Sequence, residues 1–402
     1  MKNDLPKGWT VKNLGEVTSY VDYRGKTPIK STEGIFLVTA KNVKAGYINY
    51  EISKEYIPYE NYEEVMRRGK PQIGDVLITT EAPMGNVASI DRVGFALAQR
   101  IIKLRGKEGI IQNDFLKFYL SSPKFQAELD EKSTGSTAKG IKGSVLHKMP
   151  LSIPPLPEQQ KITQILSTWD EAIQTTQHLL DKLESRKKGM MEELLSGKGK
   201  VWETVILEEL GDFTKGMGIT KVELVEQGIP CIRYGEIYTV HHFVVSKFYS
   251  FISKETAKES RKIAKNDILF AGSGETLEDI GKAVVFIGNE EVYAGGDIII
   301  FSPTNINLDS TYLSYLLNSE FVRKQIRTFG QGQSVVHLYT RDISKIKILL
   351  PSLEEQTTIA KILNTAETEI QETKAYLKTL KQQKKGLMQQ LLTGKIIVKT
   401  NG

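Results

Sequence analysis

The most regular hydrophobic pattern in the chain occupies two stretches, residues 154–198 and 351–395. In each stretch apolar residues recur alternately four and three positions apart, which is a period of 3.5. That period is typical of a coiled-coil seam, whereas a straight amphipathic helix has a period of about 3.6. The pattern predicts two helices of about 38 residues, each roughly 57 Å long. The predicted seam consists of Ile162, Leu166, Trp169, Ile173, Thr176, Leu180, Leu183, Lys187, Met190 and Leu194, and of Ile359, Leu363, Ala366, Ile370, Thr373, Leu377, Leu380, Lys384, Leu387 and Leu391.

Both helices carry capping signals at their ends. Ser352 and Glu355 have the spacing of a capping box, and Pro157 suits the first turn of the first helix. Gly197 and Gly394 suit the left-handed position that follows a helix C-terminus.

The segment before each helix is β-rich. Short apolar runs bounded by Gly, Asn or Asp predict strands in mixed or antiparallel sheets. One helix is expected near the end of each segment, at Asn113–Leu120 and Ser310–Leu317. The predicted strands cover residues 34–38, 75–78, 100–104, 283–287 and 297–301.

The chain is a tandem repeat with an offset of 197 residues. Residues 154–198 and 351–395 share 21 identities in 45 ungapped positions. Upstream the likeness is weaker but ordered: residues 14–17 match 210–213, and residues 74–77 match 266–269. The offset there varies from 192 to 197, which indicates loops of different length on a shared scaffold.

Four polar residues interrupt the seam, two in each helix. Thr176 and Thr373 would lie close together if the helices run antiparallel, or at a partly exposed edge of the seam. Lys187 and Lys384 lie near the helix ends, and we expect their ammonium groups to reach water.

Composition limits the class of protein. The 402 residues include one cysteine, Cys231, so the sequence offers no intramolecular disulfide and no cysteine-based metal site. A content of 40% apolar and 25% charged residues is typical of a globular protein. No apolar run reaches the roughly 18 residues of a membrane span, and no signal peptide is evident. We expect a cytoplasmic protein.

The motifs of the repeat resemble those of a known family. Pro154-Pro155-Leu156-Pro157-Glu158-Gln159 opens the first helix, and Lys187-Lys188-Gly189 precedes its end at Leu194-Leu195-Ser196-Gly197-Lys198. With the opening Leu5-Pro6-Lys7-Gly8-Trp9, they resemble the DNA specificity subunit of type I restriction-modification systems over essentially the whole chain. One departure is that Ser352-Leu353-Glu354 replaces Pro155-Leu156-Pro157 in the second copy, which weakens the rigid start of the second helix.

The resemblance implies an α+β protein with a pseudo-twofold repeat. Two β-rich target recognition domains, residues 1–153 and 199–350, would each read half of a bipartite asymmetric DNA site. Helices within residues 154–198 and 351–402 would form an antiparallel coiled coil that sets the spacer and docks two methyltransferase subunits. Motor-nuclease subunits would complete the complex. S-adenosylmethionine, ATP and Mg²⁺ would bind to those partners, and this chain would hold no cofactor and no metal.

The sequence lacks the motifs of a catalytic subunit. The Pro154-Pro155 pair follows Ile153 and does not fit an adenine methyltransferase motif, and no Walker loop occurs. Adjacent His241 and His242 would face opposite sides of a strand, so they are expected to be solvated and not to share a metal.

The net positive charge of the first lobe favours DNA binding, whereas the net charge of the second lobe gives no indication for or against it. Residues 1–157 carry 23 basic and 17 acidic groups, and residues 199–353 carry 17 and 19. Within the lobes, polar and basic side chains beside glycine-containing loops can approach phosphates and base edges. The predicted DNA contacts are Arg24, Lys26, Thr27, Lys41, Asn42, Lys139 and Lys142 in the first lobe, and Lys215, Thr220, Lys221, Arg233, Tyr234, Gln331, Gln333 and His337 in the second.

Two alternatives remain open from the sequence. The chain is also compatible with the recognition subunit of a type IIB-like restriction-modification enzyme, in which one partner methylates and cuts. A coiled-coil scaffold whose lobes bind proteins would instead show no salt-dependent DNA affinity.

Overall fold

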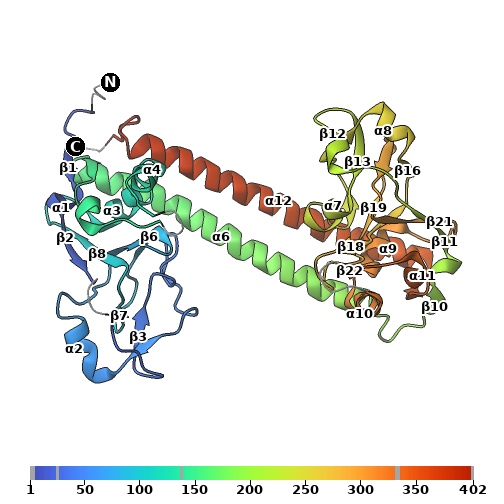
Figure 1. The fold of residues 1–402 in the computed structure, drawn as a ribbon, viewed down its shortest axis with the longest axis horizontal. Coiled ribbons are helices and arrows are strands. Elements are labelled where there is room, and N and C mark those ends of the chain that lie inside the picture. Colours follow the sequence, from blue (N-terminus) through green and yellow to red (C-terminus); the bar gives the residue numbers. More distant parts are fainter. Residues whose placement is uncertain (1–4, 24–26, 136–138, 331–335, 400–402) are drawn as a thin grey trace. The chain divides into compact units, whose positions relative to one another are not determined.

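The computed structural model describes residues 5–23, 27–135, 139–330 and 336–399. They form two compact units (Figure 1). Unit 1 combines the residues up to Gln177 with those from Ala375 onward, and unit 2 is the continuous stretch His178–Lys374. Predicted DNA contacts Arg24, Lys26, Gln331 and Gln333 lie outside the described residues.

Two long helices, α6 (Leu156–Leu194) and α12 (Leu353–Leu391), contribute one half to each unit. Their predicted ends are confirmed. Pro157 lies in the first turn of α6, and Gly197 and Gly394 adopt φ of +62° and +72° just beyond the helices. The Ser352 hydroxyl accepts a hydrogen bond from the Glu355 amide at 3.3 Å, which supplies one half of the expected capping box.

The predicted seam positions of both helices are buried or partly buried. Thr176 donates its hydroxyl proton to the carbonyl of Ala172 at 2.8 Å, and Thr373 donates to Glu369 at 2.7 Å. Each hydroxyl is therefore satisfied within its own helix, so neither threonine needs a polar partner elsewhere.

Lobe 1, the β-rich part of unit 1, has three sheets in the strand orders β2-β8-β5-β6, β4-β3-β7 and β1-β9. Its elements are β1 (Thr10–Asn13), α1 (Leu14–Val17), β2 (Thr18–Asp22), β3 (Ile35–Val38), β4 (Tyr56–Ile57), η1 (Tyr59–Asn61), α2 (Tyr62–Val65), β5 (Val76–Thr80), β6 (Met84–Ser89), β7 (Ala96–Leu97), β8 (Ile101–Gly106), α3 (Asn113–Leu120), α4 (Pro123–Glu131), α5 (Gly143–Leu146) and β9 (Pro150–Ile153).

Lobe 2, the β-rich part of unit 2, has a central sheet in the order β11-β21-β17-β19-β14 and a smaller one in the order β12-β15-β13-β20-β16, with the pairs β10-β23 and β18-β22. Its elements are β10 (Glu203–Ile206), η2 (Leu207–Glu209), β11 (Gly211–Lys215), η3 (Lys221–Glu223), β12 (Leu224–Val225), β13 (Ile229–Ile232), α7 (Tyr234–Thr239), β14 (Val244–Val245), β15 (Ser250–Ile252), α8 (Lys254–Lys258), β16 (Arg261–Ile263), β17 (Ile268–Ala271), β18 (Ser273–Gly274), β19 (Ala283–Phe286), β20 (Val292–Ala294), β21 (Ile298–Pro303), α9 (Ser310–Leu317), α10 (Glu320–Phe329), β22 (Val336–His337), α11 (Thr340–Ile343) and β23 (Lys347–Leu350).

Each lobe is layered around a central strand whose side chains alternate between two cores. In β5, Val76 and Ile78 belong to the core that also contains α3 and α6, whereas Leu77 belongs to a second core with β3 and β7. In β17, Ile268 faces the core shared with α9 and α12, and Leu269 faces the core shared with β13 and β20. One layer of each lobe therefore packs on the long helices, and a second layer lies on the other side of the central sheet.

The strands and the two lobe helices predicted from the sequence are confirmed. Helices α3 and α9 have the predicted bounds, and strands β3, β5, β8, β19 and β21 cover the predicted apolar runs. The sheets β4-β3-β7 and β12-β15-β13-β20-β16 are mixed, because β3 pairs in parallel with β7 and β13 with β20, whereas the sheet β2-β8-β5-β6 is antiparallel. The expectation of one helix per lobe was wrong, since the amphipathic helices α4 and α10 follow α3 and α9.

Among the helices of the described part of the chain, none combines the length and the apolar character that a membrane span requires.

Candidate functional site

A buried glutamine fastens lobe 1 to the start of α6. The Gln159 side chain accepts a hydrogen bond from the Gln112 amide at 2.9 Å, and it donates to the carbonyls of Ile110 at 2.8 Å and Pro154 at 2.9 Å. The residue is fully buried, so these three bonds also satisfy backbone groups that water cannot reach. They hold the segment before α3 against the long helix.

Gln356 repeats this arrangement at the start of α12. It accepts from the Asp309 amide at 2.9 Å and donates to the carbonyls of Asn307 at 3.0 Å and Pro351 at 2.9 Å. The replacement of Pro155-Leu156-Pro157 by Ser352-Leu353-Glu354 therefore leaves the attachment of the second helix to its lobe unchanged.

The neighbouring glutamates bind a tryptophan of the same unit. The Trp9 indole donates to Glu158 at 3.0 Å, and the Trp202 indole donates to Glu355 at 3.1 Å. Each tryptophan immediately precedes the first strand of its lobe, β1 or β10. Sequence comparison of the halves missed Trp202, although its position directly before a strand was a usable signal.

The glycine that ends each long helix packs on the same tryptophan. A Cβ atom on Gly197 would lie 3.0 Å from the Trp202 ring, and one on Gly394 would lie 3.7 Å from the Trp9 ring and 2.7 Å from Pro6. The end of α6 is thus fitted to lobe 2, and the end of α12 to lobe 1, in equivalent ways.

Among the ion pairs that join the helices, one is repeated and occurs once in each unit. Lys187 of α6 pairs with Glu367 of α12 in unit 2, and Lys384 of α12 pairs with Asp170 of α6 in unit 1. Adding 197 to Asp170 and Lys187 gives Glu367 and Lys384, so the second pair is the repeat of the first. The expectation that these lysines extend to water was wrong, because carboxylates outside the seam reach them.

Each of these ion pairs, Lys187–Glu367 and Lys384–Asp170, also contacts aromatic rings of the adjacent lobe; we call each pair with its rings a junction. The Lys187 ammonium lies 3.7 Å from the centroid of the Phe243 ring and 5.5 Å from that of Tyr315. The Lys384 ammonium lies 5.2 Å from the Phe118 centroid, and Phe118 is the repeat of Tyr315. Each lysine therefore bonds to the opposite helix and makes a cation–π contact with the adjacent lobe.

The junction in unit 2 is the more buried of the two. The side chains of Lys187 and Glu367 are 8% and 13% exposed, against 16% and 46% for Lys384 and Asp170. Burial opposes ionisation of Glu367, but the hydrogen bond and the charge of Lys187 outweigh it and lower the pKa of that carboxyl. For Lys187, burial outweighs the bond to Glu367 and lowers the pKa of the ammonium, so burial acts against the charged form of both partners.

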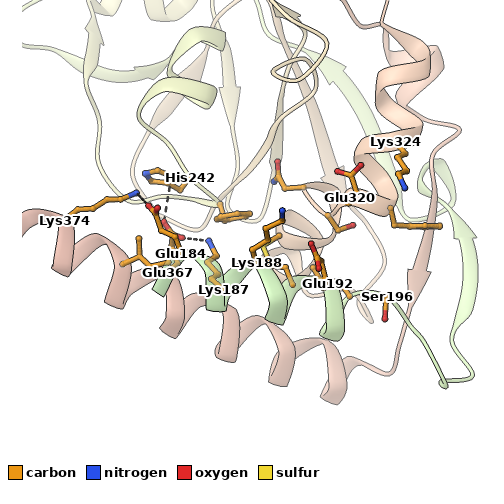
Figure 2. A pocket seen from close by; sticks show the side chains of 17 residues that line it. Glu184, Lys187, Lys188, Glu192, Ser196, His242, Glu320, Lys324, Glu367 and Lys374 are labelled. Atoms are coloured by element: carbon orange, nitrogen blue, oxygen red, sulfur yellow. Dashed lines mark hydrogen bonds and ion pairs between the residues drawn. The ribbon is translucent and has the colours of Figure 1, made fainter. Parts of the chain in front are cut away.

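A cavity of about 610 Å³ lies beside this junction in unit 2 (Figure 2). Figure 2 shows Lys187 directed toward Glu367. Lys374 forms an ion pair with Glu184, with 2.7 Å between Nζ and Oε1. The lining combines apolar side chains with a charged rim, so it can accommodate a group that is partly apolar. It comprises Glu184, Lys187, Lys188, Met191, Glu192, Leu195, Ser196, His242, Phe243, Asn318, Ser319, Glu320, Phe321, Lys324, Glu367, Ile370 and Lys374.

The histidine expectation was wrong for His241, which is 3% exposed. Burial lowers the pKa of its imidazole and favours the neutral form. His242 instead lies 3.9 Å from Glu367. Within the described part of the chain, no group of three or more His, Cys, Asp and Glu side chains is arranged to hold a metal ion.

In lobe 1, the described candidates for DNA contact differ in accessibility. Thr27, Lys41 and Lys142 are exposed, and Lys139 is exposed but paired with Asp130 at 2.6 Å. Asn42 is fully buried, and its amide bonds to Thr39, Asn49 and Ile52. These bonds use both ends of the amide to shape the loop, and the DNA contact of Asn42 stays a prediction.

In lobe 2, the candidates fall on three separate segments. Lys215 and Lys221 are exposed on either side of residues 216–219, and Thr220 between them bonds to Glu223 at 2.6 Å. The other candidates lie at the start of α7 and on β22. Arg233 is the N-cap residue of α7, and its guanidinium lies 3.8 Å from the Glu236 carboxylate. The next residue, Tyr234, is 37% exposed. On β22, the His337 ring shares a 3.0 Å hydrogen bond with the Ser273 hydroxyl.

The chain is similar to known specificity subunits along its whole length. It is 25% identical to the type I restriction enzyme MjaVIII specificity subunit of Methanocaldococcus jannaschii, over 98% of this chain and 94% of that protein. It is 24% identical to the putative MjaX specificity subunit of the same organism, over 99% and 96%. The crystal structure of the S subunit of a type I restriction-modification system from M. genitalium shares the fold, with a TM-score of 0.62, 15% identity, and coverage of 98% and 97%.

A family model gives the assignment. The model described as type I restriction modification DNA specificity domain matches twice, over residues 6–185 and 199–382. Each match contains one lobe and most of the long helix that follows it. The chain therefore belongs to the type I restriction modification DNA specificity domain family.

Proposed function

We propose that this chain is the DNA-reading, non-catalytic subunit of a type I restriction-modification complex, in which each lobe binds one half of a bipartite site. The observation that carries the proposal is the double match to the specificity domain on two lobes with equivalent attachments to long helices. Different loops on a repeated scaffold suit the reading of two unlike half-sites. The domain bounds that we propose are 1–153 and 199–350 for the lobes, with the helices in 154–198 and 351–402.

The helices are proposed to form an antiparallel coiled coil that sets the gap between the half-sites. The buried positions with a period of 3.5 support this, as do the pairs Lys187–Glu367 and Lys384–Asp170, which join the C-terminal half of one helix to the N-terminal half of the other. A separation near one turn of DNA, about 10 bp, would place both lobes on the same side of the duplex.

The chemistry of the complex is assigned to its partners. Two methyltransferase subunits would dock on the repeated helical surfaces and use S-adenosylmethionine, and motor-nuclease subunits would use ATP and Mg²⁺. A pseudo-twofold chain can recruit a pair of identical partners, because the repeat offers the same side chains twice.

The test is to purify the chain with the methyltransferase encoded beside it and to sequence the positions methylated in a random DNA pool. We expect two short half-sites with a fixed unspecified gap, methylated on both strands. Complex formation without sequence-specific methylation would reject the DNA-reading role. Absence of a complex, together with DNA affinity that does not change with salt, would favour a protein-binding scaffold.

A further inference from the structure

The outer layer of each lobe lies on the side of the central sheet away from the long helices. In lobe 1 this layer has its own core, which includes Val38 of β3 and Met66 after α2. No residue of that cluster, within the described chain, belongs to α6 or α12, whereas Ile162 and Met388 belong to the core on the other side. The outer layer is therefore free of the contacts that attach the lobe to the helices.

In lobe 1, residues 27–29 lie beside η1 and α2 on this outer layer. Residues 27–29 and the segment of η1 and α2 line a small cavity of about 110 Å³, to which Asn61 and Arg67 contribute. Arg67 is exposed, and its guanidinium has no partner among the described residues. Ile29, beside it in the lining, is 72% exposed.

Lobe 2 repeats this juxtaposition with different residues. Helix α8 corresponds to α2, because each follows a strand that pairs antiparallel with β13 or β3. The loop after β11 packs on it: Ile219 and Ala257 share one buried cluster, and a Cβ atom on Gly218 would lie 3.1 Å from the Ser260 hydroxyl.

This second surface also carries exposed cations. Lys258 at the end of α8 and Arg261 just beyond it are exposed, with no ion-pair partner in the described chain. Lys215 and Lys221 flank the loop itself, and Met217 between them is 48% exposed. Within the described residues, each lobe thus places at least one unpaired cation and one exposed apolar side chain at the same point of the fold, although their sequences differ there.

We infer that each lobe reads DNA with one surface of its outer layer. In lobe 1 this surface consists of residues 27–29 with η1 and α2, and in lobe 2 of the loop after β11 with α8. This inference rests on the proposed function and names the residues that carry it. Arg67 and Asn61 in lobe 1 can make paired hydrogen bonds to guanine and adenine edges. Lys258 and Arg261 in lobe 2 can contact phosphates or guanine, and exposed Ile29 and Met217 can contact thymine methyl groups.

The experiment compares the motif methylated by the wild-type complex with that of variants at each surface. Arg67→Ala is expected to reduce discrimination at one base pair of one half-site by roughly 5- to 150-fold, and to leave the other half-site unchanged. The double variant Lys258→Ala/Arg261→Ala should act on the other half-site only. Arg67→Lys keeps the charge and removes the planar fork, so a base contact predicts loss of discrimination in this variant too.

Matched controls separate this surface from a general decrease in positive charge. Lys132→Ala after α4 and Lys345→Ala after α11 remove exposed lysines from the layers that face the long helices. Both should leave the motif intact. In binding to a random 40-bp duplex, each substitution that removes a phosphate-binding cation from the proposed surface should reduce the slope of log K against log salt by about 0.9.

The outcomes distinguish failure of the inference from failure of the proposed function. A wild-type complex that methylates a bipartite motif, with the Arg67 and Lys258/Arg261 variants unchanged in motif and salt slope, would overturn the surface and leave the function standing. A variant that alters both half-sites together would also overturn it. If the wild-type complex yields no motif, the proposed function itself fails. Thermal unfolding followed by circular dichroism checks that each variant is folded.

Discussion

A buried aspartate occupies the same place in both lobes, directly before the central strand, but its partners differ. Asp75 in lobe 1 forms a two-bond pair with Arg105, at 2.6 and 2.9 Å, and lies 3.3 Å from Lys103. In lobe 2, Asp267 accepts hydrogen bonds from the Ser302 hydroxyl at 2.7 Å and the Ala264 amide at 2.7 Å. Strand pairing places Ser302 where lobe 1 has its arginine, and Asp267 forms no ion pair within the described part of the chain.

The two carboxyls consequently titrate in opposite directions. For Asp75, burial raises the pKa, but the hydrogen bonds and charges of Arg105 and Lys103 outweigh it, so the pKa is lowered. For Asp267, burial dominates and raises the pKa. The stabilisation from Asp75 is therefore present above the pKa of the unfolded state and is lost as pH falls through the lower, folded-state pKa. Asp267 has the opposite effect on stability. Its ionisation in the folded state costs stability, and this cost appears as pH rises through the raised pKa of the folded state.

Asp75→Asn is therefore expected to destabilise lobe 1 at pH 7 by about 1.5–3 kcal/mol, because it removes a charge-assisted pair. Asp267→Asn should change the stability of lobe 2 by less than about 1 kcal/mol, since no cation is left without a partner. Hydrogen exchange of the β5 and β17 peptides reads each lobe separately. The effect of Asp75→Asn should shrink as pH falls below about 3.9, the pKa of an aspartate in an unfolded chain. An equal effect of both substitutions at pH 7 would contradict this account.

At the scale of elements, the lysine junctions decide how the helices and lobes fit together. Lys187 is held between Glu367 of α12 and the Phe243 ring of lobe 2, whereas the equivalent Lys384 and Asp170 are more exposed. A buried pair is costly to break, because the remaining charge stays in a poorly hydrated site.

Charge reversal tests this difference. Lys187→Glu or Glu367→Lys alone is expected to cost about 3 kcal/mol, because either leaves two like charges in a buried site. The double variant should recover part of the stability, but the cation–π contact with Phe243 stays broken. The matched changes at Asp170 and Lys384 should cost less than about 1 kcal/mol, since exposed pairs contribute little. Urea midpoints measure these effects, and equal destabilisation at both junctions would refute the burial argument.

The elements that the sequence predicted well are those with a strong local pattern. Helices α3 and α9 and the ends of α6 and α12 follow from periodicity and capping residues. Strands β4, β7 and β14 have two residues each, which is too short for alternation to be visible. Helix α10 was missed because its charged face gave no long apolar period, although its amphipathic character is clear once residues 320–329 are considered alone.

The candidate site was less predictable because its contacts are distant in sequence. Lys187 and Glu367 lie 180 residues apart, and the 3.5-residue pattern does not predict contacts of residues outside the seam, such as Glu367. Trp202 was hidden because its offset from Trp9 is 193, whereas the match of residues 14–17 with 210–213 has an offset of 196. Polarity alone selected Asn42, whereas the fold buries it. Arg67 belongs to no motif, and only its place in the lining of the cavity between residues 27–29 and α2 singles it out.

For the whole molecule, the proposal that the two long helices set the gap between the half-sites predicts how that gap changes with helix length. Inserting one heptad after Thr176 and after Thr373 keeps the seam in phase and lengthens both helices by about 10 Å. Since base pairs rise by about 3.4 Å, the unspecified gap in the methylated motif should grow by about three base pairs. Inserting the heptad into one helix alone should abolish the complex. A motif with an unchanged gap after the double insertion would show that the helices do not set it.

The packing of the end of α12 on lobe 1 has a consequence for how the protein is made. Met388, Leu391 and Leu392 share one core with Trp9 and Leu14, so the first lobe to leave the ribosome lacks part of its core until the last turns of α12 have been synthesised. Unit 2, being continuous from His178 to Lys374, is complete in sequence before that. A prematurely terminated chain would therefore fail first in its N-terminal lobe, the part farthest from the missing codons.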